Sequence, residues 1–422
     1  MAKVTGIALS ACMLAGILLF ESQAQNFGNP SRTDLGVGAA AIAMANNYVA
    51  AADDISALFW NPAAIAAYGK RHQVQFSLGG LRPLSAAEFG LDNSGFDTPR
   101  QMTSINIGNA GFLSSRGDCC RHRAFGFGLA YQTPYSLDML LDYEGSFQSV
   151  SGPVPFRNRY LSTGKLDFWT GGFGLQLADQ VFAGAALSLI SGTGSEELLY
   201  QETQSVDSLD RSYHFVADRY YAGYDARIGL LTRATDLVNI GLRMEFPSVI
   251  SFTENGVQTE ARNGSTEYCL DGYMKTYYAG AVGVQVHVPL IRVVAEVDAR
   301  APYPVVRLSD RDQQLWRMGA GLGGELEVLP GVFKARAGYA WHQYNPNPYL
   351  VIYEDPTIED QAQAPEATEG DHLATIGFAL SLGSSIAIEG AYAHRLWMAT
   401  TGVKLKELQQ EQRGVVSMSF NF

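Results

Sequence analysis

The last eight residues of the chain, Val415 to Phe422, constrain its fold more than any other segment. Apolar side chains alternate with small polar ones up to the final carboxylate: Val416, Met418, Phe420 and Phe422 against Ser417, Ser419 and Asn421. Because successive side chains of a strand point to opposite faces, one face is apolar and the other polar. Such a strand suits a wall between lipid and a polar lumen. The pattern predicts a transmembrane β-barrel, and an ordinary amphipathic edge strand is the alternative.

The other end of the chain predicts secretion. Residues 1–24 combine Lys3, an apolar run from Gly6 to Phe20 and a small-residue exit at Ser22-Gln23-Ala24. This arrangement is typical of a cleaved signal peptide, and the run is short for a membrane-spanning helix. A lipoprotein cleavage site at Cys12 is disfavoured because the apolar run continues well beyond it.

Composition supports the barrel. Of the 422 residues, 47% are hydrophobic and 17% charged, but after the signal peptide no apolar run approaches the roughly 20 residues that a membrane helix requires. Every backbone polar group in lipid must be bonded within the protein, so a secreted membrane protein without such helices is expected to be a closed barrel. The net charge of −12 argues against nucleic-acid binding.

The mature chain contains about 14 alternating runs long enough to cross a membrane as tilted strands. They cover 72–82, 102–113, 123–133, 164–178, 180–191, 217–233, 236–247, 273–288, 290–301, 313–328, 332–343, 372–382, 384–397 and 413–422. Brief turns alternate with long polar stretches, so both chain ends are expected on the periplasmic side. We expect extracellular loops over 83–101, 134–163, 192–216, 248–272, 302–312, 344–371 and 398–412, and the acidic stretch 344–371 is expected to be mobile.

Residues 25–70, ahead of the barrel assigned to 71–422, do not resemble a strand. They are rich in alanine and glycine and contain Asn61-Pro62, a natural start for a turn or helix. Small side chains let short helices pack tightly in a confined lumen, so this segment is expected to plug the barrel. A helical pair in the periplasm is the alternative.

The motif Ala52-Asp53-Asp54-x-Ser56-Ala57-x-Phe59-x-Asn61-Pro62-Ala63 resembles the N-terminal hatch of the FadL/TodX family of outer-membrane hydrophobic-compound transporters. Phe125 to Tyr135 resembles the family's third strand, which leads into a Pro-Tyr loop start, and Phe420 and Phe422 resemble the membrane-insertion signal of outer-membrane barrels. Ala64 departs from the usual Asn-Pro-Ala-Gly.

The resemblance implies a 14-stranded barrel closed by a hatch at Asp53, Asp54, Asn61, Pro62 and Ala63. It also implies capture of a lipophile by extracellular loops, an internal pocket, and sideways release through a kink in the third strand. Gly126, Gly128 and Pro134 would form this lateral gate, since glycine weakens strand pairing. The alternative for the glycines is the high glycine content of the whole chain, and Asp53 and Asp54 could instead cap the following helix.

If the ligand is a fatty acid, its carboxylate requires a cation in the lumen. Strand parity makes Arg243, Arg317 and Arg336 the candidates. The alternative is that these arginines neutralise interior acids such as Glu245, Glu325 and Glu389.

The sequence contains no recognisable catalytic motif, cofactor-binding loop or metal-ligand spacing, so we expect no enzyme, cofactor or metal. The histidines have no evident partner serine. Cys119 and Cys120 lie in a turn, and Cys269 is expected in a loop at the opposite membrane face.

Two functions remain open: transport of long-chain fatty acids or other hydrophobic compounds, and a related barrel that serves protein secretion or surface attachment. A plain porin would have no use for a plug. The expected partners are a hydrophobic small molecule, outer-membrane lipid including lipopolysaccharide, and the barrel-assembly machinery. The expected state is a monomer in a Gram-negative-type outer membrane.

Overall fold

The computed structural model describes residues 33–34, 36–67, 71–89, 104–118, 122–149, 152–202, 211–260, 264–301, 317–343, 350–353, 370–401 and 405–422. The predicted signal peptide and the pair Cys119 and Cys120 lie outside these residues. Most of the stretch 344–371 does so too.

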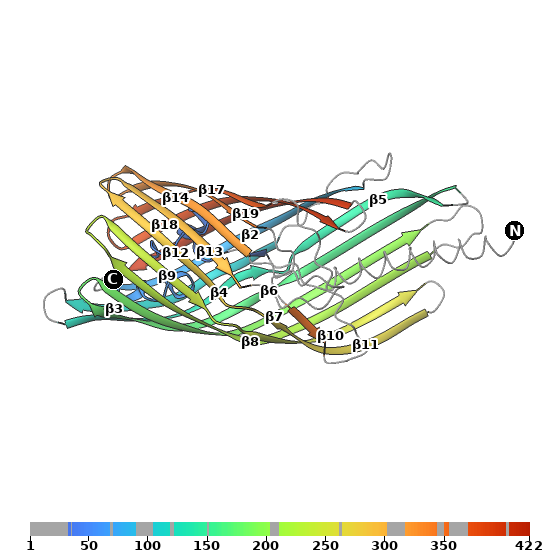
Figure 1. Cartoon of the computed structure of the whole chain (residues 1–422), viewed down its shortest axis with the longest axis horizontal. Helices are drawn as coiled ribbons and strands as arrows, with labels where there is room; N and C mark the ends of the chain where they lie inside the picture. Colours follow the sequence, from blue (N-terminus) through green and yellow to red (C-terminus); the bar gives the residue numbers. More distant parts are fainter. Residues whose placement is uncertain are drawn as a thin grey trace.

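Fourteen antiparallel strands close into a transmembrane barrel (Figure 1), which confirms the predicted fold and strand number. Each strand pairs with the next, and the last pairs with the first through Val416 opposite Leu78. The strands are β2 (Arg71–Phe89), β3 (Ser104–Asp118), β4 (His122–Ser136), β6 (Gly152–Ala178), β7 (Val181–Glu202), β8 (Arg211–Arg233), β9 (Val238–Glu245), β12 (Ala279–Val288), β13 (Ile291–Arg300), β14 (Arg317–Leu329), β15 (Phe333–His342), β17 (Asp371–Leu382), β18 (Ile386–Thr401) and β19 (Leu405–Asn421).

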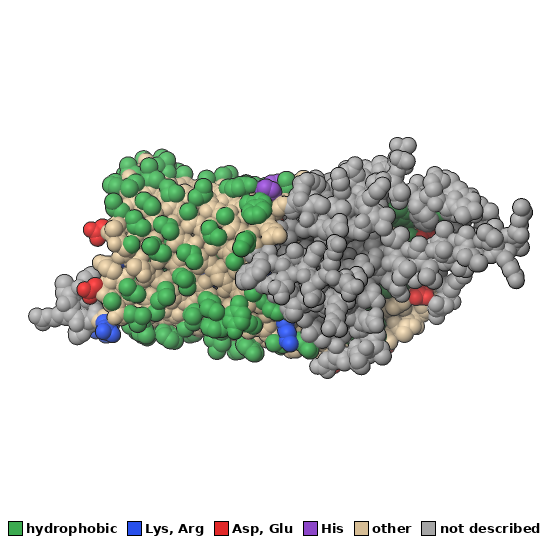
Figure 2. All heavy atoms as spheres, in the orientation of Figure 1, with side chains coloured by type: hydrophobic (Ala, Val, Ile, Leu, Met, Phe, Trp, Pro, Cys, Tyr) green, Lys and Arg blue, Asp and Glu red, His purple; other side chains and the backbone are tan. Residues whose placement is uncertain are grey.

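Alternation along these strands separates a lipid face from the lumen. Apolar side chains are exposed on the outside of strand after strand, for example Phe76, Phe127, Leu189, Leu242, Val297, Leu322, Ile376 and Met418. In Figure 2 they form a belt over one half of the molecule, and the charged side chains visible in this view lie at the ends of the belt or beyond it. Tyr224 and Tyr339 are about half exposed on the same outer face, as expected for an interfacial aromatic girdle.

Four further strands extend the wall beyond the belt on one side (Figure 1). They are β5 (Met139–Ser149), β10 (Val249–Glu260), β11 (Gly264–Lys275) and β16 (Leu350–Tyr353), and they pair with β6, with β8 and with one another. The prediction of loops over 134–163, 192–216 and 248–272 is therefore wrong. These strands lie outside lipid and need no apolar outer face, so they lack the alternation by which the others were found. Cys269 is exposed in β11 and not in a loop.

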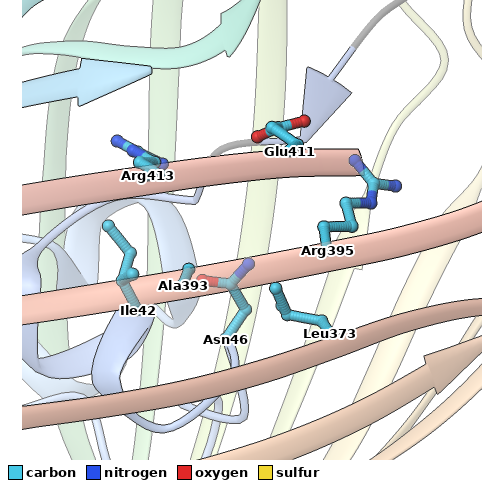
Figure 3. Close-up of a pocket in the computed structure, with 7 residues that line it drawn as sticks. All are labelled: Ile42, Asn46, Leu373, Ala393, Arg395, Glu411 and Arg413. Atoms are coloured by element: carbon cyan, nitrogen blue, oxygen red, sulfur yellow. The ribbon is translucent and has the colours of Figure 1, made fainter. Parts of the chain in front are cut away.

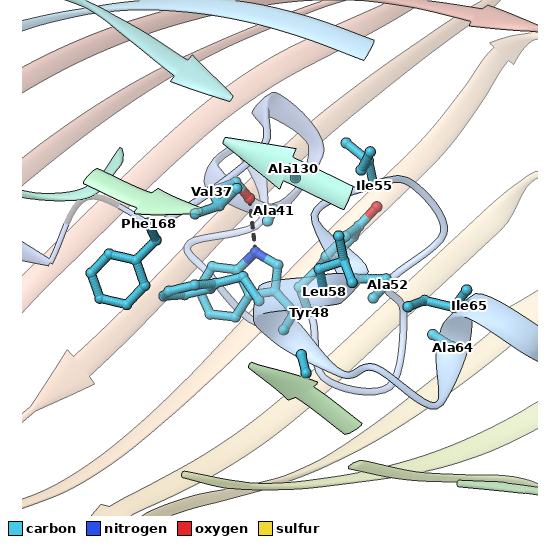
Figure 4. Close-up of a cluster of buried hydrophobic side chains, with 14 of the residues drawn as sticks. Val37, Ala41, Tyr48, Ala52, Ile55, Leu58, Ala64, Ile65, Ala130 and Phe168 are labelled. Atoms are coloured by element: carbon cyan, nitrogen blue, oxygen red, sulfur yellow. Dashed lines mark hydrogen bonds between the residues drawn. The ribbon is translucent and has the colours of Figure 1, made fainter. Parts of the chain in front are cut away.

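Residues 36–67, called the luminal segment below, lie inside the barrel. Its helices are α2 (Ala39–Ala43), α3 (Ala57–Trp60) and α4 (Ala64–Ala67), and a two-residue strand, β1 (Thr33–Asp34), precedes it. Ile55, Leu58 and Ile65 are buried with wall residues such as Ala130 and Phe168 (Figure 4), where the dashed line marks the hydrogen bond from Trp60 Nε1 to the Val37 carbonyl, 2.8 Å. No described helix has both the length and the apolar character needed to cross a membrane.

Candidate functional site

Glycines of the wall bring the luminal segment against bare backbone. A Cβ built on Gly126 would lie 2.7 Å from Ile65, and one on Gly128 would lie 3.2 Å from Leu58, closer than side chains normally approach. The same closeness to the segment recurs on ten strands, at Gly111, Gly126, Gly128, Gly172, Gly174, Gly184, Gly229, Gly241, Gly283, Gly321, Gly323, Gly338 and Gly377. The segment therefore fills the lumen from wall to wall at this level. Because successive residues of a strand face opposite sides, the sequence could have identified these glycines as facing the lumen.

Asn61 explains the Asn-Pro-Ala motif. Its Nδ2 donates to the carbonyl of Val49 at 2.8 Å and to that of Leu230 in β8 at 3.0 Å, while its Oδ1 accepts from Ala63 N at 3.1 Å. The fully buried amide thus joins two parts of the segment to the wall. Pro62 precedes α4, where its missing N–H is not needed. Ala63 is buried, and its backbone lies so close to Gly184 that a Cβ on the glycine would overlap Ala63 N.

Asp53 and Asp54 attach the segment to the wall in different ways. Asp53 forms an ion pair with Arg292 of β13 at 3.0 Å and accepts from Tyr48 Oη at 2.5 Å. Burial raises the pKa of the Tyr48 phenol, so the hydroxyl keeps its proton and remains a donor. Asp54 accepts from Ser56 N at 3.0 Å, just ahead of α3, and from Gln75 Nε2 of β2 at 3.0 Å. Both aspartates therefore bond to the wall, whereas the N-cap position of α3 belongs to Ser56.

The wall is irregular at Pro134, in the third membrane strand. The pairing of β4 with β6 shifts register between Gln132 and Tyr135, and its pairing with β3 ends where Gln132 faces Asn109. The register runs unbroken past Gly126 and Gly128, so the irregularity lies beyond them, and their part in a lateral gate stays a prediction. The close approach of the luminal segment is a second reason for glycine at both positions.

The backbone of β1 lies beside the irregular end of β4. Thr33 pairs with Ser136 and Asp34 with Tyr135. Both pairs lie beyond Gln132, the residue at which β3 stops pairing with β4. The chain just ahead of the luminal segment thus supplies backbone partners where the neighbouring wall strand does not.

A cavity of about 110 Å³ lies between the luminal segment and the wall. Phe59 and Trp60 line it from the segment, and Tyr135 lines it from β4. The Phe59 ring meets those of Trp60 and Tyr135 edge-on, with centroids 5.1 and 6.3 Å apart. Several wall residues in its lining are the first or last residues of strands that are joined by the long connections. They are Glu245, Ala279, Arg300, His342 and Asp371. The cavity therefore faces the expected extracellular side.

The three candidate arginines differ in what surrounds them. Arg336 donates to Glu325 at 2.7 Å and to Glu389 at 2.8 Å, so two acids already neutralise it. Arg243 lines the cavity with its guanidinium carbon 5.3 Å from the Trp60 ring centroid, and it approaches Glu245 only to 3.4 Å. Its Nε and Nη1 are buried without a hydrogen-bond partner among the described residues. The side chain of Arg317 does not belong to the part of the chain that the structure describes.

A second, smaller pocket of about 10 Å³ adjoins the cavity through Asn46, Leu373 and Arg395 (Figure 3). Arg395 binds both carboxylate oxygens of Asp371, and Asn46 has the left-handed φ of 65°. The pocket holds about one water molecule.

Two other expectations concern the periplasmic edge. Phe420 and Phe422 end the barrel with exposed outer side chains, and Phe422 N donates to the His72 carbonyl at 2.9 Å; their role in insertion stays a prediction. His72 Nδ1 lies 2.9 Å from Ser114 Oγ, so the expectation that no histidine has a partner serine is wrong. The two residues are cross-strand neighbours of β2 and β3, in a regular ladder that engages the surrounding backbone N–H groups. No oxyanion site accompanies the pair there.

No family model and no curated protein matches the chain. Solved structures do. The toluene transporter TodX of Pseudomonas putida superposes with a TM-score of 0.58 at 17% identity, covering 92% of this chain and 99% of TodX. A Pseudomonas aeruginosa FadL homologue gives 0.60 at 11%, covering 92% and 98%, and the Ralstonia pickettii toluene transporter TbuX gives 0.57 at 14%, covering 92% and 99%. The chain therefore has the fold of the FadL and TodX outer-membrane channels, as its hatch motif suggested.

Proposed function

We propose that the protein is an outer-membrane transporter for hydrophobic compounds, with long-chain fatty acids among its candidate ligands. The observation that carries the proposal is the cavity between the luminal segment and the irregular end of β4, where Arg243 adjoins Phe59, Trp60 and Tyr135. The lining also contains Arg300, Arg395 and four acids, and a site that joins aromatic rings to such cations suits an amphiphile with an anionic head.

A cluster of buried aromatic side chains supports the route of capture. It contains Tyr135 and Phe168, whose rings are 5.4 Å apart, and Tyr221 of β8 and Phe252 of β10, whose rings are 6.2 Å apart. A lipophile following these side chains reaches the cavity with little exposure to water. Extracellular elements would capture the ligand, and the luminal segment would act as the hatch below it.

Sideways release is the second part of the proposal. The segment fills the lumen, so the ligand would leave the cavity through the wall at Pro134, past Tyr135, into the outer leaflet. A small rearrangement of the segment and β1 would open this route, because β1 supplies pairing that β3 does not. Release into lipid avoids hydrating an apolar ligand.

Arg243 is the proposed partner of a ligand carboxylate. Two of its nitrogens lack hydrogen bonds within the described chain and the side chain is 10% exposed, whereas Arg336 is held by two acids. A buried donor without a partner is unfavourable by about 1 to 3 kcal/mol, and a bound carboxylate would remove that penalty. Arg317 remains a candidate by strand parity alone.

Native mass spectrometry of the barrel, extracted in a detergent that does not resemble lipid, tests the proposal. We expect a bound acyl compound that Arg243→Gln releases and that the exposed control Lys275→Gln retains. An empty barrel in every sample that also fails to take up added dodecanoate or toluene would contradict transport. A co-purifying secretion partner would favour the export or attachment function.

A further inference from the structure

On the outer face of the wall, side chains bridge the interrupted ladder between β4 and β6. Gln132 faces Phe168 and Tyr135 faces Leu166, so Asp167 alone stands opposite the two bulged residues, Thr133 and Pro134. A bulge of this kind leaves backbone groups unpaired and weakens the local ladder. The wall is therefore held here by side chains more than by backbone.

Asp167 is the centre of this contact. Its Oδ1 accepts from Tyr131 Oη at 2.6 Å and from Thr133 Oγ1 at 3.0 Å, both on β4. Lys165 Nζ lies 3.2 Å from the same oxygen and 2.8 Å from Tyr131 Oη. The carboxylate, 17% exposed, thus joins β6 to the two residues of β4 on either side of the point where pairing stops.

The contact lies at the edge of the lipid-facing belt that is nearer to the expected extracellular side. Along β6 the exposed outer residues are Leu175, Phe173 and Trp169, and Asp167 and Lys165 continue the same face. The Trp169 ring packs edge-on against Tyr131 with centroids 5.0 Å apart. The inner face of the same bulge carries Tyr135, which lines the cavity. One strand thickness therefore separates the cavity from the Asp167 contact.

We propose that Asp167 is the positioning residue of the lateral exit: its carboxylate clasps the bulged end of β4 to β6 and sets the rate at which a ligand in the cavity leaves for the bilayer. This inference rests on the proposed transport function. Removing the carboxylate frees the end of β4 while leaving the cavity lining and the luminal segment intact. Capture is therefore unchanged and release accelerates.

A matched control exists on the extended strands. Thr253 Oγ1 donates to Asp271 Oδ1 at 2.7 Å, the same pair of side chains, but the two residues face each other in an unbroken ladder between β10 and β11. Replacing Asp271 removes a similar bond at a place where the backbone alone holds the strands.

The experiment uses the full-length barrel in lipid vesicles, with pyrene and pyrene-labelled dodecanoate as ligands. Energy transfer from tryptophan reports capture, and pyrene excimer emission from the bilayer reports release. We expect Asp167→Leu to bind both ligands like the parent protein and to release them at least about tenfold faster, since the two hydrogen bonds that hold β4 to β6 are lost. Asp167→Asn, which keeps the accepting oxygen but loses the charge that pairs with Lys165, is expected to fall between, and Asp271→Leu to match the parent.

Release from Asp167→Leu at or below the parental rate would overturn the clasp while leaving transport standing. If Asp167→Leu does not give the heat-modifiable folded band, Asp167→Asn decides by the same criterion. Failure of the parent protein to capture either ligand would instead overturn the proposed function, and the clasp with it.

Discussion

Arg227 lies over the ring of Phe59, with its guanidinium carbon 3.8 Å from the ring centroid, and its Nη1 donates to the Phe59 carbonyl at 3.1 Å. One wall arginine thus holds both the side chain and the backbone of the luminal segment, next to the cavity.

Arg227→Met is expected to loosen the segment, because it removes a buried cation–π contact and a charged hydrogen bond together. Amide protection over residues 57–67 should fall at least about tenfold. Hydrogen exchange with mass spectrometry measures this, and Arg123→Met, at an exposed position of β4, should leave protection unchanged. Equal protection in the two variants would show that Arg227 does not hold the segment.

Gly229→Ala is expected to displace Asn61 and Pro62, since a Cβ at this position would overlap the Asn61 side chain. Overpacking of this kind typically destabilises by about 1 to 3 kcal/mol. The barrel ladder should persist while exchange in residues 57–67 rises. Gly414→Ala is the control, because a Cβ there meets no atom within 4 Å; a similar effect of both substitutions would contradict the close-approach explanation.

Burial, with Glu389 and Asp53 adding to it, raises the pKa of Asp54 from 3.8 to about 6. A carboxyl whose pKa is raised by folding stabilises the packed segment most when protonated. Its contribution should therefore be complete below pH 3.8, decline by about 3 kcal/mol as pH rises toward 6, and stay constant above that value. Protection factors of residues 36–67, corrected for intrinsic exchange, should follow this curve. Asp54→Asn should reduce this change and leave the part due to Glu296, which accepts from Val49 N at 2.9 Å, whereas Asp179→Asn, in an exposed turn, should not alter it.

Replacing Asn61, Pro62 and Ala63 by Gly, Ser and Gly is expected to leave the barrel folded, because the strand ladder does not depend on them. The triple variant loses the link to Leu230 and the tight fit beside Gly184. Uptake of a fluorescent fatty acid by whole cells should change. Uptake equal to that of the parent, by a correctly inserted barrel, would exclude the segment from transport.

Period-2 alternation was sufficient to predict all fourteen membrane strands, because lipid on one side imposes it. Alternation could not tell which of the candidate arginines is already neutralised by acids. Parity places Arg243 and Arg336 inside alike, but register decides their neighbours: Arg336 faces Glu325, whereas Arg243 faces Gly229 and Ala281. Register depends on turn lengths and bulges across the whole sheet, which alternation within one strand does not contain.

The third strand continues past Pro134, which the alternation had placed in a loop, and the packing reason for Gly126 and Gly128 was not evident from the sequence. That reason is Ile65 and Leu58, about sixty and seventy residues earlier in the chain. A close approach between distant segments leaves no local signal beyond the absence of a side chain.

The ring of wall glycines makes the luminal segment and the barrel a single fitted pair. Exchanging the segment for that of a structural relative would require reshaping the backbone-lined cylinder that receives it, position by position. Chimeras among such barrels should therefore tolerate swapped outer hairpins far better than swapped interiors, and substitutions that enlarge a segment residue beside one of these glycines should be poorly tolerated.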